Sequence, residues 1–194
     1  ATPKKGGKIK AAWDSTSAKD TMDPAKTLSL LDLGRATLMY NRIVEVGPDM
    51  KLRPGLATSW ESNKKADEWV FKIRKGVTFH NGKTMTAADV VASMKQYVGA
   101  KGSNAGLSPF FDAAGVSAKG LYTVVFRLQS PIGVFPYLVR QTTYQAIIQP
   151  AALAAKPGSW VASGMIGTGA FKLKKYVDKK SAELVRHDAY WGGR

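Results

Sequence analysis

Apolar and polar positions along the chain predict a mixture of strands and helices. Trp69, Phe71 and Ile73 alternate with the other positions of 69–74, which is the period of a half-buried strand. Residues 121–128 are rich in Val, Tyr and Phe and predict a second strong strand. Residues 171–177 and 182–186 flank a polar turn and predict a hairpin.

Helical periodicity appears in three places. Ser29 and Asp32 have the spacing of a capping box, and the apolar residues behind them, with Arg42 on the same face, extend a helix to about residue 41. Thr86 and Asp89 form a similar pair, with a helix predicted over 87–98. Pro131 is expected to start a short helix that reaches about residue 139.

Weaker patterns fill the rest of the chain. Residues 8–13 and 145–148 are expected to form short strands, 52–61 is expected to be extended, and 14–23 and 99–106 are expected to be loops. Gly47-Pro48-Asp49 is typical of a turn. Strands and helices mix without regular alternation, so the fold class is α/β or α+β.

Composition describes an ordinary folded protein. The chain has 194 residues, of which 44% are apolar and 22% charged, and it has no apolar run of the roughly 20 residues that span a bilayer. It contains no cysteine, which excludes disulfides, thiolate metal sites and cysteine nucleophiles. Residues 1–7 lack the apolar centre of a signal peptide.

The charge balance is consistent with anionic partners, and equally with an ordinary protein that has a well-hydrated basic surface. Twenty-nine Lys and Arg against 14 Asp and Glu give a net charge of +15, which can attract nucleic acid, anionic lipid or anionic solutes. The predicted hairpin concentrates this charge, with Phe171 and Tyr176 interleaved. That arrangement fits a nucleic-acid stripe with stacking rings, or simply a strand with one solvated face. Its lysines are Lys172, Lys174, Lys175, Lys179 and Lys180.

Two glycine motifs resemble phosphate-binding loops. Gly76 and Gly82-Lys83-Thr84 lie between a predicted strand and helix, but five residues separate the glycines where a phosphate-binding loop has four. Gly167-Thr168-Gly169 lacks a third glycine and is followed by a strand, whereas a dinucleotide needs a helix N-terminus there. Both motifs therefore favour a structural role.

Catalytic and metal-binding signatures are weak. His80 and His187 are the only histidines and have no metal-ligand spacing, so we expect no metal site, and His80 beside Asn81-Gly82 is expected to lie in a turn. No Gly-x-Ser-x-Gly nucleophile motif is present. Nothing in the sequence requires an enzyme or a cofactor.

Four stretches together resemble one protein family. They are LRPGLATSWE at 52–61, WVFKIRKGVTFHNGK at 69–83 followed by TAADV at 86–90, GTGAFKL at 167–173, and YWGG at 190–193. In order and spacing this pattern is similar to the family 5 extracellular solute-binding proteins of ABC importers, which include the dipeptide-, oligopeptide- and nickel-binding proteins. The resemblance extends from about residue 8 to 194.

The resemblance implies a type II periplasmic-binding-protein fold. Members have two lobes that close over a ligand, and their YWGG segment precedes the second lobe. It follows that this chain is an N-terminal portion without the second lobe. Residues 1–46 and 165–194 would form part of the first lobe, and 47–164 an inserted α+β subdomain.

The resemblance also implies a receptor that is not an enzyme. It would be exported to the periplasm or the extracellular space, bind a peptide or a small anionic solute without a cofactor, and deliver that solute to an ABC permease. Ligand contacts are expected from the loop after the first strand, from the segment after Asp23-Pro24, and from the edge of the subdomain. The candidate residues are Ser15, Thr16, Thr27, Leu28, Ser103, Asn104, Arg140 and Tyr144.

Two other classes of function remain as alternatives. The charge of +15 would suit a basic anion- or nucleic-acid-binding module, although the resemblance predicts no nucleic-acid partner. The other alternative is a nucleotide-dependent enzyme, in which Gly82-Lys83-Thr84 would have to bind the nucleotide. The incomplete first lobe also predicts exposed sheet edges and self-association of this chain.

Overall fold

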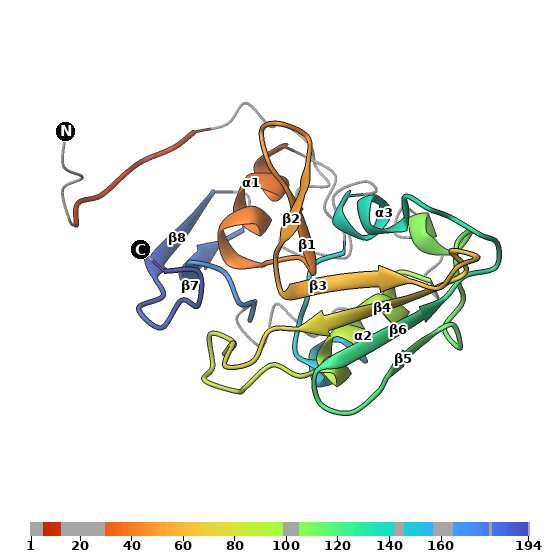
Figure 1. Cartoon of the computed structure of the whole chain (residues 1–194). Coiled ribbons are helices and arrows are strands. Elements are labelled where there is room, and N and C mark those ends of the chain that lie inside the picture. The colour runs from red at the N-terminus through yellow and green to blue at the C-terminus, as the bar shows by residue number, and fades with distance from the viewer. Residues whose placement is uncertain are drawn as a thin grey trace.

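A computed structural model describes residues 6–12, 30–98, 105–141, 146–156, 165–178 and 180–193 (Figure 1). The fold combines a four-stranded sheet, two hairpins and short helices. The helices are α1 (Leu30–Met39), α2 (Ala87–Gln96), α3 (Phe135–Gln141), α4 (Ala151–Ala154) and a 3-10 turn at Ala105–Leu107. The strands are β1 (Val44–Val46), β2 (Leu52–Pro54), β3 (Ala57–Ser62), β4 (Glu68–Ile73), β5 (Val116–Ala118), β6 (Thr123–Arg127), β7 (Phe171–Val177) and β8 (Ser181–Arg186).

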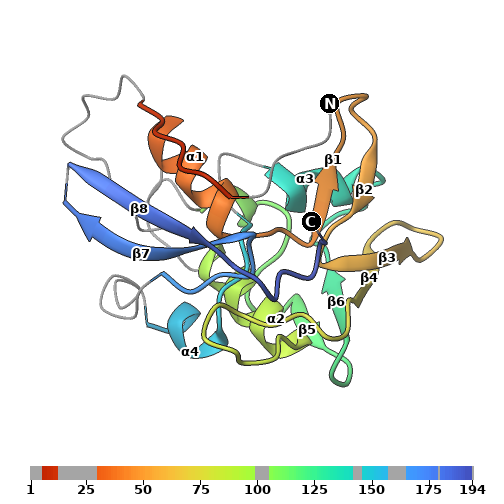
Figure 2. The same ribbon diagram turned by 90° about the vertical axis from the view of Figure 1, so that its left-hand side faces the viewer.

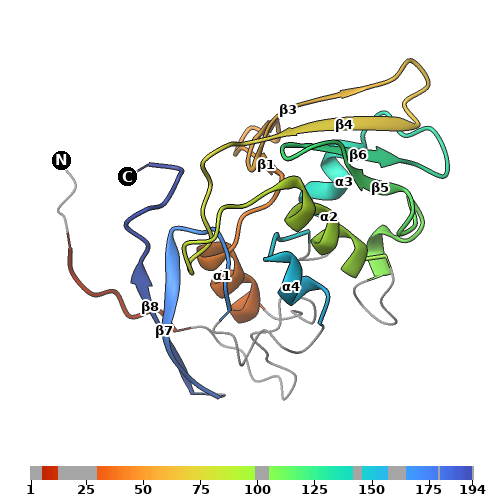
Figure 3. The ribbon, with the colours of Figure 1, turned by 90° about the horizontal axis from the view of Figure 1, so that it is seen from below.

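The main sheet has the antiparallel order β3-β4-β6-β5 and carries the core on one face. Trp69, Phe71 and Ile73 of β4 are buried, whereas Lys72 between them is exposed. Helices α2 and α3 lie on the same side of this sheet (Figure 3). The rings of Phe126 and Phe135 pack edge-to-face on Phe71, with centroids 5.3 and 6.3 Å away, so sheet and helix share one aromatic core.

The start of α2 is fixed by one buried carboxylate. Asp89 is fully buried and accepts hydrogen bonds from the Thr86 N–H at 2.9 Å and the Thr86 hydroxyl at 3.1 Å. It also accepts the Ala151 N–H at 2.8 Å and pairs with the Lys83 ammonium at 2.7 Å. One side chain therefore joins the starts of α2 and α4 to the turn that carries Lys83.

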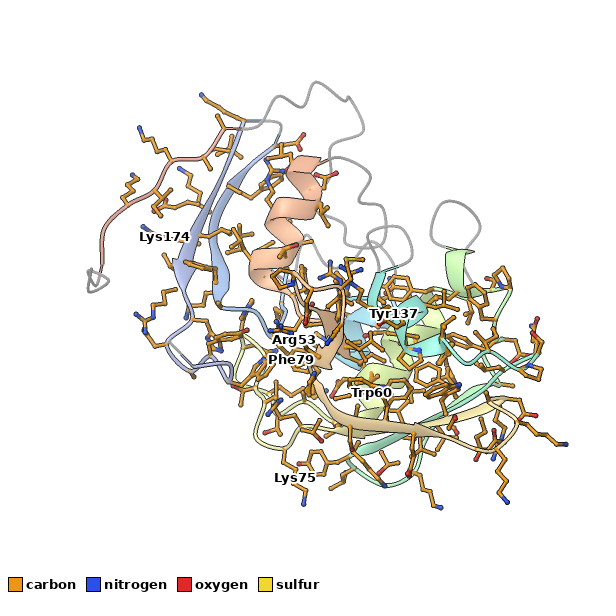
Figure 4. The ribbon with its side chains drawn as sticks, turned by 45° about the horizontal axis from the view of Figure 1, so that its top comes forward. Arg53, Trp60, Lys75, Phe79, Tyr137 and Lys174 are labelled. Atoms are coloured by element: carbon orange, nitrogen blue, oxygen red, sulfur yellow. The ribbon has the colours of Figure 1, made fainter. Side chains whose placement is uncertain are left out.

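A second layer lies beside the sheet-and-helix part. In Figure 2 the β7–β8 hairpin runs along α1. Leu173 and Tyr176 of β7 pack toward the core, and the Arg35 guanidinium of α1 lies 6.0 Å from the Tyr176 ring centroid. Lys174 projects from the hairpin on the side away from the main sheet (Figure 4). One hairpin face is thus packed and the other is basic.

Several predicted elements are confirmed with small shifts. The helix expected to end near residue 41 is α1, the helix at 87–98 is α2, the strand at 121–128 is β6, and the hairpin is β7–β8. The extended stretch at 52–61 divides into β2 and β3, and the turn at Gly47-Pro48-Asp49 joins β1 to β2. The predicted polar loop at 14–23 lies outside the described residues, as does most of the loop expected at 99–106.

Three predictions were wrong. Residues 8–12 form no strand, because among the described residues no neighbour pairs with them. Residues 146–148 make a single bridge, Arg42 to Ile147, in place of a strand. The third helix begins at Phe135 and not at Pro131, because the Ile132 N–H donates to the Ala66 carbonyl and the Ile132 carbonyl accepts the Trp69 indole N–H at 3.2 Å. Strands β1 and β5 and helix α4 were missed.

Candidate functional site

Two distant motifs meet at Asn41, two residues after the end of α1. The Asn41 amide oxygen accepts hydrogen bonds from the Thr168 hydroxyl at 3.0 Å and the Trp191 indole N–H at 3.2 Å. Its amide nitrogen donates to the Tyr190 hydroxyl at 3.5 Å. Asn41 therefore joins the Gly-Thr-Gly and Tyr-Trp-Gly-Gly motifs, about 127 and 149 residues further along the chain.

The glycines of Gly167-Thr168-Gly169 allow the backbone to approach the end of α1. A Cβ atom on Gly167 would collide with the Met39 carbonyl oxygen, and one on Gly169 would collide with the Met39 backbone. The Gly169 N–H donates to that same carbonyl oxygen at 2.9 Å. This close contact accounts for both glycines and leaves no role for them in a dinucleotide site.

His80 fixes the same segment from the other side. Its Nδ1 accepts the Gly167 N–H at 3.2 Å, so Nε2 carries the proton and donates to the Gly169 carbonyl at 3.1 Å. The backbone N–H of His80 donates to the Gly167 carbonyl at 2.9 Å. Both ring nitrogens are thus hydrogen-bonded to the backbone of the Gly167–Gly169 segment.

The electrostatic surroundings keep His80 neutral. Burial, followed by the charges of His187 and Lys172, lowers the pKa of His80 to about 4, against the opposing hydrogen bond to the Gly169 carbonyl. The two histidine rings are 5.1 Å apart in an edge-to-face arrangement. Burial and Lys172 also lower the pKa of His187. The expectation that His80 lies in a turn is confirmed, and the turn has a specific partner.

Arg74 connects the main sheet to the Trp191 ring. Its guanidinium lies 4.7 Å from the ring centroid and donates from Nε and Nη2 to the Gly55 carbonyl, both at 3.3 Å. Asn41, His80 and Arg74 thus all contact the Gly-Thr-Gly or Tyr-Trp-Gly-Gly motif. We call this group of contacts the junction, and its residues are Asn41, Arg74, His80, Thr168, Tyr190 and Trp191. The junction positions the end of the described chain against the sheet-and-helix part.

A buried arginine, Arg42, directly follows Asn41. Arg42 is 9% exposed, and its closest carboxylate is Glu45, with Nη1 to Oε2 at 3.9 Å. Arg140, in the last turn of α3, is half-buried. Burial, and more weakly the charge of Arg140, lowers the pKa of Arg42, while the nearby Glu45 and Tyr97 oppose that change.

The predicted ligand residues fall almost entirely outside the described part of the chain. Only Arg140 lies within it. The others stay predictions without a structural test: Ser15, Thr16, Thr27, Leu28, Ser103, Asn104 and Tyr144.

The phosphate-loop resemblance at residues 76–84 is explained by a hairpin-like turn. Thr78 and Thr84 form an antiparallel bridge, and the Phe79 N–H donates to the Lys83 carbonyl at 2.8 Å. Phe79 is fully buried, and Lys83 is bonded to Asp89. These contacts fix the loop without a phosphate.

Clustered metal ligands and membrane-spanning helices are both absent from the part of the chain that the structure describes. Within those ranges, no three His, Asp or Glu side chains converge as metal ligands would. None of the described helices has the length and apolar composition needed to span a bilayer.

Residues 51–194 match the family model described as bacterial extracellular solute-binding proteins, family 5 Middle. The chain belongs to this family. The match includes Arg74, His80, Thr168, Tyr190 and Trp191 of the junction, and it confirms the resemblance drawn from the motifs. Members of the family are solute-binding proteins, not enzymes.

Curated relatives include periplasmic peptide-binding proteins. The oligopeptide-binding protein OppA of Haemophilus influenzae is 28% identical over 198 residues, which cover 90% of this chain and 35% of the relative. The murein peptide-binding protein MppA of Escherichia coli is 27% identical, with 88% and 35% covered. The chain therefore spans about a third of the length of these relatives, as expected for a portion of a family member.

Solved structures show the same fold. A structure of AgaA with agropinic acid from A. tumefaciens R10 matches at a TM-score of 0.75 and 26% identity, over 89% of this chain and 35% of that one. Haemophilus influenzae OppA with the peptide RPPGFSPFR matches at 0.73 and 29%, over 89% and 37%. The fold class is thus confirmed as the type II periplasmic-binding-protein fold, represented here by part of it.

Asn41 and Arg42 were not among the predicted site residues. The periodicity placed Arg42 on a helical face, but α1 ends at Met39 and Arg42 pairs with Ile147. The sequence did offer one signal, a polar pair that begins two residues after an amphipathic helix. Its meaning depends on partners more than a hundred residues away.

Proposed function

We propose that this chain is the N-terminal part of the solute receptor of an ABC importer, working in the periplasm or the extracellular space. Its cargo would be a peptide or a small anionic solute, and its membrane partner an ABC permease. The single observation that carries the proposal is the family match over residues 51–194. Peptide-binding relatives and the agropinic acid complex support the range of solutes.

The chain itself is proposed to bind solute without catalysing a reaction or using a cofactor. Its most highly constrained polar residues support that proposal, because their bonds connect protein segments to one another. Asn41 joins two motifs, and both ring nitrogens of His80 are engaged by backbone. A catalytic base needs a free nitrogen directed at a substrate, which His80 does not offer.

We divide the chain into part of the first lobe, at 1–46 and 165–194, and an inserted subdomain at 47–164. Packing of β7 against α1 supports the first grouping, since the two elements are more than a hundred residues apart. The sheet β3-β4-β6-β5 lies entirely within the second range. On this division the junction is one contact between the two parts, and the pairing of β1 with β2 is another.

The eight predicted ligand residues are proposed to face the cleft that the missing second lobe would close. Because a closed cleft excludes water and contacts the ligand from both sides, one lobe alone should retain only part of the affinity. Losing about 4 kcal/mol would weaken a micromolar complex to roughly millimolar.

Calorimetry on the full-length parent protein and on this chain tests the proposal, with trialanine and agropinic acid as ligands. We expect the parent to bind at least one of them and this chain to bind it roughly a thousandfold more weakly. Equal affinities would place the whole site in this chain and contradict the division between lobes. Binding of neither ligand by the parent would contradict the proposed solute range.

A DNA gel shift tests the alternative of a nucleic-acid module. Affinity that comes from phosphate neutralisation falls steeply with salt. We expect no shift at moderate salt. A shift that persists there would favour the alternative.

A further inference from the structure

One face of the β7–β8 hairpin is strongly basic. The residues of the other face pack toward the core, and they are Leu173, Tyr176, Ala182 and Leu184. Side chains alternate between the two faces of a strand, so Lys172 and Lys175, next to packed positions, project away from the core. Both are exposed, and so are Lys174 at the β-bulge and Lys180 in the turn. We define the basic face as Lys172, Lys174, Lys175 and Lys180.

Most of this charge has no carboxylate partner. Glu183 is the one carboxylate on β8, and its Oε1 pairs with the Lys174 ammonium at 2.8 Å. The cross-strand neighbour of Glu183 is Lys175, which this pairing leaves without a partner. Three lysines therefore have no carboxylate within ion-pair distance among the described residues, namely Lys172, Lys175 and Lys180.

The aromatic rings of the hairpin do not lie on the basic face. The Tyr176 ring packs toward the core and lies 6.0 Å from the Arg35 guanidinium, and its hydroxyl donates to Asp178 at 3.0 Å. Phe171 stands two residues before Leu173, which places it on the packed side, and it is 37% exposed. Proteins that bind single-stranded nucleic acid stack the bases on exposed rings. The basic face offers charge without such a stacking surface.

We propose that the basic face adsorbs to the anionic phospholipid headgroups of a membrane. A bilayer presents its charge over a plane, so several lysines on one face of a hairpin can contact headgroups at the same time. Lysine ammoniums are point charges, whereas the bidentate geometry that reads base edges belongs to arginine. With no ring on this face to insert, binding is electrostatic and superficial. The setting beside a membrane rests on the proposed function, in which the receptor meets a permease, but the charge of the face does not.

Co-sedimentation of this chain with lipid vesicles tests the proposal. The vesicles contain phosphatidylcholine and phosphatidylglycerol in equal parts, and vesicles of phosphatidylcholine alone are the reference. We expect binding to the mixed vesicles at about 0.1 M sodium chloride, none to the reference, and release at about 0.5 M, where screening shortens the range of the charges to roughly 4 Å. Equal binding to both kinds of vesicle, or binding that survives the higher salt, would overturn the proposal.

Two triple variants with the same net charge distinguish the basic face from general attraction. Each lysine near an anionic surface strengthens binding about fivefold, so the test variant should bind the mixed vesicles roughly a hundredfold more weakly. The control removes three exposed lysines from turns of the main sheet and should bind within about threefold of the unmodified chain. Equal loss in both variants would overturn the site. The test variant carries Lys172→Gln, Lys175→Gln and Lys180→Gln, and the control carries Lys64→Gln, Lys65→Gln and Lys119→Gln.

A competition experiment separates lipid from nucleic acid. A DNA duplex is added to the vesicle-bound chain at equal phosphate concentration. We expect most of the chain to stay on the vesicles. Displacement of more than half of it would overturn the lipid assignment in favour of nucleic acid.

The full-length parent keeps this proposal distinct from the proposed function. The parent should bind the same vesicles, and the test substitutions should abolish that binding without changing its affinity for trialanine or agropinic acid. A parent that binds solute but not vesicles would overturn the proposal. A parent that binds vesicles but neither solute would contradict only the proposed function.

Discussion

Replacement of Phe71 by Ala should remove the centre of the aromatic core. Phe71 is fully buried, stacks on Trp60 at 6.3 Å and meets Phe126 and Phe135 edge-to-face. Losing the transfer free energy of a buried phenyl ring costs about 1.5–3 kcal/mol, and the cavity left in a rigid core adds to it. We therefore expect the free energy of unfolding to fall by about 3–5 kcal/mol.

Urea denaturation followed by tryptophan fluorescence measures this loss. With a slope of about 2 kcal/mol/M, the midpoint should move down by roughly 2 M urea. Lys72→Ala is the matched control, since Lys72 is the exposed neighbour on the same strand and should cost less than about 0.5 kcal/mol.

A double-mutant cycle makes the reasoning sharper. Phe71 and Phe126 have ring centroids 5.3 Å apart, and their coupling should be about 0.5–1.5 kcal/mol. Equal destabilisation by Phe71→Ala and Lys72→Ala would refute the assignment of the buried face. Complete additivity of the two phenylalanine substitutions would refute the role of the ring pair.

Three further predictions concern pH, one buried carboxylate and assembly. Since the pKa of folded His80 is about 4, below its usual 6.5, the unfolded chain binds more protons between these values. The contribution of His80 to the free energy of unfolding should be fully present above about pH 6.5. It should decline by about 2 kcal/mol toward pH 4, after allowance for the partial exposure of the ring. In urea melts at several pH values, His80→Gln should remove most of this pH dependence. Asp89→Ala should lower the free energy of unfolding by about 3–5 kcal/mol, because it leaves two backbone N–H groups and Lys83 without their acceptor. Asp89→Asn should cost less. Similar urea midpoints for the two variants would contradict this account. Strands β7 and β8 pair only with each other among the described residues, so sedimentation should show an average mass that rises with protein concentration, and a constant monomer mass would contradict it.

Local periodicity determined much of the fold in advance. Strand β4 was predicted from the alternation of Trp69, Phe71 and Ile73, since a strand with one buried face needs an apolar residue at every second position. Helix α2 was predicted from Thr86 and Asp89 with the apolar face behind them. The β7–β8 hairpin was predicted from two short runs joined by a polar turn. In each case the signal lies within a single stretch of at most 16 residues.

Elements fixed by distant partners were missed or displaced. Helix α3 begins four residues later than predicted because the backbone of Ile132 is bonded to Ala66 and Trp69, which no local pattern reveals. Strand β5 has only three residues and depends on pairing with β6. A short strand has too few positions to show a period.

The candidate site shows the same division. The motifs containing His80, Thr168 and Trp191 were recognisable in the sequence and sufficient for the family. Only the tertiary structure showed that Asn41 joins two of them, and that Arg42 is buried with the Glu45 carboxylate 3.9 Å away. Sequence records the residue types, but desolvation and hydrogen-bond capacity depend on what surrounds each group in space. Those surroundings are set by packing between segments more than a hundred residues apart.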